Sequence, residues 1–233
     1  MPKDTRQCYT EKSVREEIER IISNTDKLVI ATFYGRDLDR FRNFYEVAKK
    51  YKRKFVISMR LAYLLYKVKE DSTFEIPDVL TDDTIFIYKK RKRSGEFEEK
   101  DYQKWERIFL DKAVNYKYIN NHQSNVILNL DLFSFQELID IRPKAGSHFI
   151  HSMSEPFSEE DINDDLMHKW LDHFKLEFHQ VHASGHCSGE EIKDLIRRIN
   201  PKKLFPIHTE YPEMLKGIIK DTLIVEKNKA YAI

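Results

Sequence analysis

The chain has 233 residues, of which 34% are charged and 41% hydrophobic, and its net charge is only +1. This length is sufficient for one large domain or two modest domains. Near neutrality excludes a global basic field for nucleic acid, so any such attraction needs local patches. Two cysteines far apart in sequence do not suggest a disulfide framework. With no visible signal peptide and only strand-sized apolar runs, we expect a cytoplasmic protein without membrane association.

The first two thirds of the chain alternate between helix and strand patterns. One helix is expected to begin with a capping box at Ser13 and to bury Val14, Ile18, Ile21 and Ile22, and a second begins at about Asp37. Strands are expected at residues 27–33, 55–58, 85–88, 125–130 and 148–151. This alternation predicts an α/β fold with a doubly wound, Rossmann-like parallel sheet. No glycine-rich phosphate loop follows the first strand, so a nucleotide cofactor is poorly supported.

Two candidate phosphate-binding segments precede the histidine-rich part of the chain. Ser58 and Arg60 stand at the carboxyl end of a core strand and form a polar patch that could face a cleft. The run Lys89–Arg93 could contact phosphates with help from Tyr88 and Phe97. A solvated hairpin tip is the favoured interpretation of this run, because Ser94 and Gly95 follow it directly.

A domain boundary is expected near residue 160, after a polar loop over residues 152–161. Beyond it, the pattern predicts a helix over 164–174 whose inner stripe includes Leu166, Trp170, Leu171 and Phe174. A strand over 178–181 and a helix over 188–199 follow, the helix with a capping box from Ser188 to Glu191. A further strand is expected at 203–207, and a terminal strand pair at 223–233.

Histidines follow both strands of this second strand-helix-strand unit. A compact unit of this kind should be a right-handed parallel crossover, so both strands would end at one edge of the sheet. His186 and His208 would then meet there, where ligands of open α/β sheets collect. Ser184, Gly185 and the first amides of the following helix form a plausible anion seat. The arrangement is suited to handling phosphate or metal.

The paired motifs His182-Ala-Ser-Gly-His-Cys-Ser-Gly-Glu-Glu and Pro206-Ile-His-Thr-Glu resemble those of the β-CASP branch of the metallo-β-lactamase superfamily, and of archaeal ribonuclease J-like nucleases in particular. Segments at 10–60, 142–147 and 154–159 extend the similarity. The resemblance implies a β-CASP domain over 1–160 and, over 161–233, the C-terminal part of a metallo-β-lactamase αββα fold. It implies zinc-dependent hydrolysis of phosphodiester bonds in RNA.

The resemblance also implies roles for single residues. His186 matches a catalytic histidine beside the scissile phosphate, and His208 matches a zinc ligand. His182 and Ser184 match positions that contact an RNA phosphate. Gly185, Ser58 and Arg60 complete the residues that we expect to bind RNA.

The family's His-x-His-x-Asp-His zinc signature is absent from these 233 residues. A dinuclear site needs several ligands per ion, which His208 and a distant imidazole cannot supply. We therefore expect the isolated chain to bind no zinc pair and to be inactive. It would need the N-terminal lactamase half, on the same or a separate polypeptide, and it could form a homodimer through exposed apolar surface. The alternative is a non-catalytic RNA-binding or scaffold subunit of an RNA-processing complex.

Overall fold

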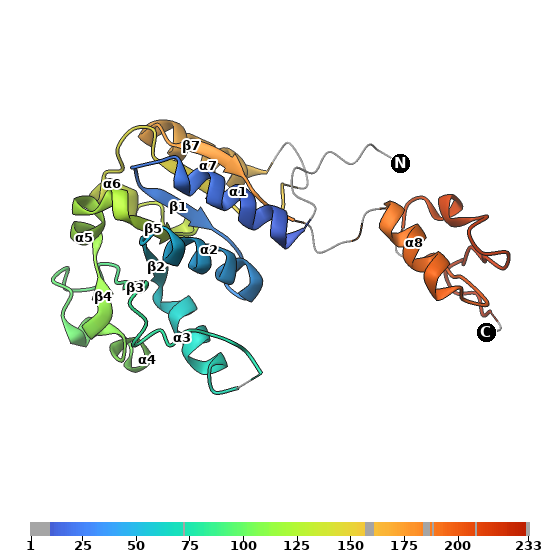
Figure 1. Cartoon of the computed structure of the whole chain (residues 1–233), viewed down its shortest axis with the longest axis horizontal. Helices are drawn as coiled ribbons and strands as arrows, with labels where there is room; N and C mark the ends of the chain where they lie inside the picture. Colours follow the sequence, from blue (N-terminus) through green and yellow to red (C-terminus); the bar gives the residue numbers. More distant parts are fainter. Residues whose placement is uncertain are drawn as a thin grey trace. The chain divides into compact units, whose positions relative to one another are not determined.

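The computed structural model describes residues 10–71, 73–156, 161–183, 187, 189–207 and 209–231, and it contains two compact units (Figure 1). The described residues up to Ala183 form the first unit, and those from Cys187 onward belong to the second. The predicted site residues Ser184, Gly185, His186 and His208 lie outside the described residues.

The first unit is built on a seven-stranded, entirely parallel sheet with the strand order β4-β3-β2-β5-β1-β6-β7. The strands are β1 Val29–Thr32, β2 Lys54–Ser58, β3 Ile85–Tyr88, β4 Ala113–Val114, β5 Val126–Asn129, β6 His148–His151 and β7 Glu177–Gln180. The predicted parallel sheet is therefore confirmed. The two-residue strand β4 is the one strand of this sheet that the apolar pattern did not predict.

Helices cover both faces of this sheet, as a doubly wound fold requires. They are α1 Glu11–Ser23, α2 Leu38–Lys50, α3 Met59–Val68, α4 Lys104–Arg107, α5 Tyr116–Asn121, α6 Glu137–Ile141 and α7 Ile162–Phe174, with 3-10 turns at Glu99–Asp101, Leu110–Lys112, Gln123–Asn125 and Leu132–Ser134. One core cluster joins α1, α2 and α3 to one face. A second cluster joins α5, α6 and α7 to the other face. None of the described helices is both long and apolar enough to cross a lipid bilayer.

The N-cap of the first helix lies three residues before the expected capping residue Ser13. Thr10 is the N-cap of α1, and its side chain accepts a hydrogen bond from the Ser13 amide while Ser13 reciprocates. The apolar stripe is nevertheless the predicted one, because Val14, Ile18, Ile21 and Ile22 are buried. The second helix begins where predicted, because Asp37 is the N-cap of α2 and its carboxylate accepts from the Arg40 amide.

The two compact units divide after Ala183, later than the boundary expected near residue 160. The reason is backbone pairing: β7 pairs with β6 in parallel, with His148 opposite Glu177. The intervening helix α7 buries Met167 and Leu171 in the same core, whereas Leu166, which was expected to face inward, is 44% exposed. The assignment of the two expected segments to β-CASP and lactamase folds stays a prediction.

The described part of the second unit contains the helix α8 Gly189–Ile199 and a 3-10 turn at Pro212–Leu215. The strand expected at 203–207 is wrong, because Leu204 makes only an isolated bridge with Thr222. The terminal strand pair is also wrong over residues 223–231. A strand needs a neighbour that continues the hydrogen-bond ladder, and the described residues of this unit offer none for these segments.

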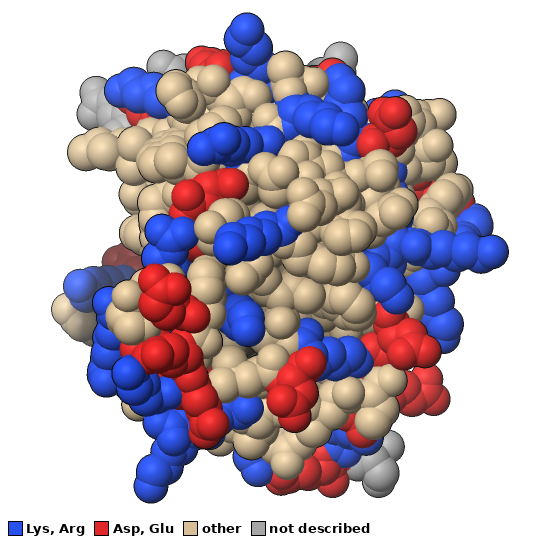
Figure 2. All heavy atoms as spheres, turned by 90° about the vertical axis from the view of Figure 1, so that its left-hand side faces the viewer, with Lys and Arg blue, Asp and Glu red and all other residues tan. Residues whose placement is uncertain are grey.

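The basic run Lys89–Arg93 is largely engaged within the first unit. Lys92 pairs with Glu106 at 2.6 Å, and the Arg91 guanidinium lies over the Tyr116 ring. Tyr88 is buried and donates to Glu137, so it cannot stack on a base. Figure 2 shows Lys and Arg interspersed with Asp and Glu on one side of the molecule, without a continuous basic band among the described residues in view.

Candidate functional site

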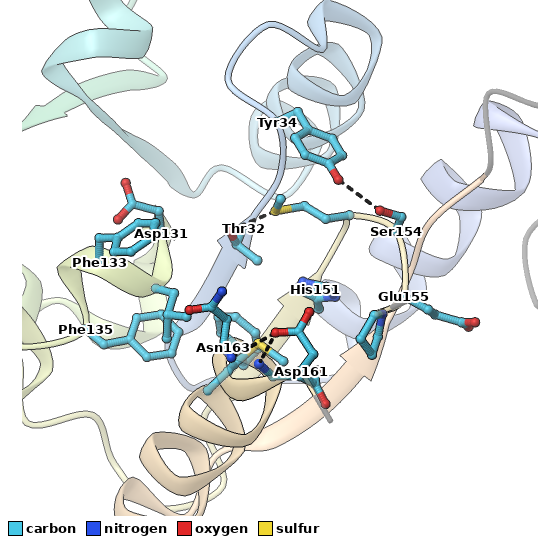
Figure 3. A pocket seen from close by; sticks show the side chains of 16 residues that line it. Thr32, Tyr34, Asp131, Phe133, Phe135, His151, Ser154, Glu155, Asp161 and Asn163 are labelled. Carbon is cyan, nitrogen blue, oxygen red and sulfur yellow. Dashed lines mark hydrogen bonds between the residues drawn. The ribbon is translucent and has the colours of Figure 1, made fainter. Parts of the chain in front are cut away.

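A cavity of about 310 Å³ lies at the carboxyl ends of β1, β5 and β6 (Figure 3). Its walls come from the residues that follow these three strands and from the first turn of α7. The lining residues are Thr32, Tyr34, Asp131, Leu132, Phe133, Phe135, Phe149, His151, Met153, Ser154, Glu155, Pro156, Asp161, Asn163, Asp164 and Met167.

The strand order explains why the cavity forms there. The chain leaves β1 towards α2 on one face of the sheet, whereas it leaves β5 and β6 towards α6 and α7 on the other. Neighbouring connections that diverge in this way open a crevice at the carboxyl edge, which is where open α/β sheets bind ligands. The predicted site was placed elsewhere, after the segments 178–181 and 203–207, and none of its described residues lines this cavity. That site stays a prediction.

The cavity is lined by four acidic side chains and by no lysine or arginine among the described residues. Asp131, Glu155, Asp161 and Asp164 all contribute to the lining. Asp161 is the N-cap of α7 and accepts from the amides of Asn163 and Asp164, so a carboxylate already occupies this helix terminus. Carboxylates repel phosphate, and the cavity is consequently better suited to an uncharged group than to an anion.

His151 is the one imidazole in the described lining. Its Nδ1 lies 2.8 Å from Oε1 of Gln180, while the Gln180 amide nitrogen donates to the Met153 carbonyl. Because an amide oxygen only accepts, Nδ1 must carry the proton and Nε2 is left as an acceptor. Burial lowers the pKa of His151, so the ring is neutral at physiological pH.

The remaining walls are apolar and aromatic. Phe135 and Phe149 are buried and pack edge to face at 5.4 Å between ring centroids, whereas Phe133 is 83% exposed. Tyr34 and Ser154 share a hydrogen bond of 2.9 Å across the opening (Figure 3). An exposed aromatic ring beside such a cavity can stack on a planar ligand, while the hydrogen-bonding groups of the cavity contact the edge of that ligand.

The predicted RNA-binding residues Ser58 and Arg60 lie at the carboxyl edge but outside this cavity. Ser58 ends β2 and caps α3, because its hydroxyl accepts from the Leu61 amide at 3.3 Å. Arg60 is exposed in the first turn of α3. Three strands separate β2 from β7, so these residues lie about 19 Å or more from the strand that leads to His182. The structure does not bring them together with His182.

His182 follows β7 and is half-buried beside the guanidinium of Arg40. Nη1 of Arg40 lies 3.4 Å from Nδ1 of His182. Because an arginine can only donate, Nδ1 must be the acceptor and the neutral ring carries its proton on Nε2. Burial, and then the positive charge of Arg40, lower the pKa of His182.

Arg40 itself is a residue that the sequence analysis missed. Its side chain is fully buried on α2, pairs with Glu11 at 2.8 Å and donates to the carbonyl and hydroxyl of Ser152. A signal was present, since Arg40 lies one turn before Phe44 on the inner face of the predicted helix. Polar residues on such a face are usually there to satisfy other buried groups.

The described residues do not fit the dinuclear zinc centre that the resemblance implies. One group of three His, Cys, Asp or Glu side chains in the described ranges brings its ligand atoms within 4.8 Å of one another, namely His148, Glu177 and His179. Three protein ligands suit one ion and not two bridged ions. His151 lies on the opposite side of β6 from His148, together with Phe178.

Comparison with known proteins defines the class. Residues 172–216 match the family described as the RNA specificity domain of Zn-dependent metallo-hydrolases. This segment begins in the last turn of α7 and includes β7 and α8. The chain thus combines a doubly wound α/β unit with a segment that is similar to this RNA specificity domain.

Two particular proteins are similar to this chain, one in sequence and one in fold. Ribonuclease J 2 of Streptococcus pyogenes serotype M3 is 22% identical over 219 residues, which is 89% of this chain and 35% of that protein. A solved structure of a protein of unknown function from Enterococcus faecalis V583 covers 98% of this chain with a TM-score of 0.68 and 19% identity, and the match is 47% of that protein. The chain spans about a third of the length of the curated relative.

These findings support the predicted resemblance of the chain to ribonuclease J and to Zn-dependent metallo-hydrolases that carry an RNA specificity domain. The narrower likeness to archaeal members stays a prediction.

Proposed function

We propose that this chain is part of a zinc-dependent RNA-processing nuclease, in which it binds RNA and completes the cleavage site. The match of residues 172–216 to an RNA specificity domain carries this proposal. The resemblance to ribonuclease J 2 supports it. Because the matched segment includes β7, the RNA specificity segment is continuous with the main sheet.

The cavity beside β1, β5 and β6 supports RNA binding of a particular kind. Its acidic rim disfavours phosphate, whereas the exposed Phe133 ring and the acceptor nitrogen of His151 suit an unstacked base. The phosphates would then contact cations and amides elsewhere, among which we propose Arg60, Ser58, His182, Ser184 and Gly185. A neutral His182 contacts a phosphate oxygen as a hydrogen-bond donor through Nε2.

His186 is proposed as the catalytic histidine and His208 as a zinc ligand. The other zinc ligands would come from a lactamase-fold portion that carries the His-x-His-x-Asp-His signature, on the same or a separate polypeptide. When bound there, zinc supplies an activated water and stabilises charge on the phosphate. This chain's residues would orient the RNA at that centre.

The test combines this chain with the polypeptide portion that carries the zinc signature and measures zinc content and RNA cleavage together. His186→Ala should abolish turnover and leave zinc content nearly unchanged, whereas His208→Ala should lower both. Equal effects of the two substitutions on zinc content would contradict the assigned roles. EDTA-sensitive cleavage by the isolated chain would refute the proposal that it depends on a second portion.

The same experiment separates the alternative function. The helix α8 exposes Ile192, Leu195 and Ile199, and an apolar surface of this kind suits a subunit that docks onto other proteins. Tight RNA binding without cleavage in the combined sample would favour a non-catalytic RNA-binding or scaffold subunit.

A further inference from the structure

Two histidines and a glutamate meet on one face of the sheet edge, away from the cavity. Nδ1 of His148 lies 2.9 Å from Nε2 of His179, and the two ring centroids are 5.1 Å apart. The same Nδ1 is 3.4 Å from a carboxylate oxygen of Glu177. All three ligand atoms lie within 4.8 Å of one another.

The strand register produces this meeting. His148 is opposite Glu177 in the β6–β7 pair, and Ile150 is opposite His179. Side chains two apart share a face of a strand, so Glu177 and His179 both face the side of His148. His151 and Phe178 lie on the opposite face, where their rings stack at 6.1 Å. The cluster therefore belongs to the face that α1 covers and not to the face that forms the cavity wall.

Two imidazoles and a carboxylate suit a transition metal such as Zn²⁺, which accepts both nitrogen and oxygen ligands. Each imidazole directs a ring nitrogen at the same small volume, and one of the two must give up its proton from the shared hydrogen bond when an ion enters. Burial lowers the pKa of both rings. Two imidazoles and one carboxylate are a set that Zn²⁺ accepts with water as a fourth ligand, whereas Mg²⁺ and Ca²⁺ prefer oxygen ligands.

The two cationic side chains near the cluster are paired with other groups, so they do not prevent a metal ion from binding. Lys27 donates to the Ala145 carbonyl at 2.8 Å, and Arg20 pairs with Glu17 at 2.6 Å. Both cations are thus engaged with oxygen acceptors, although their charges lower the affinity for a dication. The Glu177 side chain is 58% exposed, which gives an ion a path from solvent.

We propose that His148, Glu177 and His179 bind one divalent ion of the zinc type, which fastens the edge strand β7 to β6. An edge strand has a partner on one side only, so a metal crosslink would hold it where backbone pairing is weakest. Because β7 leads directly to His182, the ion would also restrain the start of the RNA specificity segment. This site is separate from the zinc centre of the proposed nuclease and stands whether or not that function holds.

The first measurement is zinc binding to the full chain after removal of metals with EDTA. One equivalent of Zn²⁺ should bind by titration calorimetry, and the thermal transition should move upward. The variants His148→Ala and His179→Ala should each weaken binding by at least about tenfold, since even the loss of an outer partner of a metal ligand costs 10–100-fold. Glu177→Gln should weaken binding less, because an amide oxygen can still coordinate.

Controls separate this site from other histidines. His151→Ala removes an imidazole from the opposite face of β6 and should leave zinc affinity unchanged. The double substitution His186→Ala with His208→Ala removes the histidines of the proposed nuclease centre and should also retain the bound equivalent. If binding disappears in that double variant and survives in His148→Ala, the inferred site is wrong and the ion belongs to the nuclease centre.

A further measurement needs no substitution at the site. X-ray absorption of the zinc-loaded full chain should show two imidazole ligands on one ion. Absence of a bound equivalent in the unsubstituted chain, or a spectrum without imidazole scattering, would overturn the proposal and leave His148, Glu177 and His179 as a hydrogen-bonded group.

Discussion

Nη1 of Arg40 donates to both the carbonyl oxygen of Ser152, at 2.9 Å, and its hydroxyl, at 2.6 Å. This pair of hydrogen bonds joins α2 to the residue that follows β6. The Ser152 hydroxyl in turn donates to the Val181 carbonyl, so the end of β7 is held in the same network. A single buried guanidinium thereby fixes the residues that follow both β6 and β7.

Replacement of Arg40 by methionine should therefore destabilise the first unit. The substitution leaves the buried groups of Ser152 and the carboxylate of Glu11 without their cation, which we expect to cost about 2–4 kcal/mol. Denaturant unfolding measures this free energy. The matched control is Arg42→Met on the same helix, whose exposed ion pair with Asp39 should contribute less than about 1 kcal/mol. Equal losses in the two variants would contradict the role given to Arg40.

Stability should decline as the pH falls below neutrality. The folded-state pKa of His151 and that of His182 are lowered from 6.5, chiefly by burial. Between pH 6.5 and the lower folded-state pKa, the unfolded chain binds more protons than the folded chain. The contribution of these histidines to the free energy of unfolding therefore falls as the pH falls through this range, and it is constant above the range. Each group contributes at most about 1.4 kcal/mol per pH unit. The variant His151→Gln should show a shallower slope in denaturant unfolding across this range, and an unchanged slope would show that His151 is not the source.

Removal of the exposed aromatic ring should weaken RNA binding without unfolding the protein. Phe133→Ala is expected to reduce the affinity for single-stranded RNA by about 1–3 kcal/mol, the usual value of one base stacked on an aromatic side chain. Fluorescence anisotropy with a labelled oligonucleotide measures the change. Ile139→Ala is the control, since Ile139 is exposed on α6 and outside the cavity. A similar loss in both variants would point to a general surface effect and not to the cavity.

A phosphate contact by Arg60 would appear in the salt dependence of RNA binding. Arg60→Gln should lower the slope of log affinity against log salt concentration by about one, because one fewer counterion is released. Lys67→Gln on the same helix serves as the control, since Lys67 is paired with Glu70 at 2.6 Å. If the two variants keep the slope of the unsubstituted chain, Arg60 does not contact the RNA backbone.

Much of the fold could be predicted from local patterns. Continuous apolar runs such as Val29–Thr32 are typical of strands buried on both faces, and alternation with capped amphipathic helices predicts a parallel α/β sheet. The motifs around His182 indicated the family, which the match at 172–216 supports. The roles assigned to His186 and His208 stay predictions, because both residues lie outside the described part of the chain.

The hydrophobic pattern gave wrong predictions where a strand depends on a partner strand that the local sequence does not identify. Residues 203–207 have strand-like composition, yet Leu204 makes one isolated bridge and no ladder. Conversely, Glu177–Gln180 joins the main sheet, which moves the division between compact units to Ala183. Periodicity shows which side of an element is apolar, but the neighbour that covers that side is selected by packing of the whole chain.

The amino-acid pattern alone was thus enough for the class of fold and for most of the buried helix faces, because these depend on short-range periodicity and capping. Contiguous motifs indicated the family resemblance. Only the tertiary structure decided the strand order, the burial of Arg40 in contact with Ser152 and the contact between His148 and His179. Residues 31 positions apart become neighbours only when the sheet selects one register among many, and that selection depends on the combined burial of side chains throughout the core.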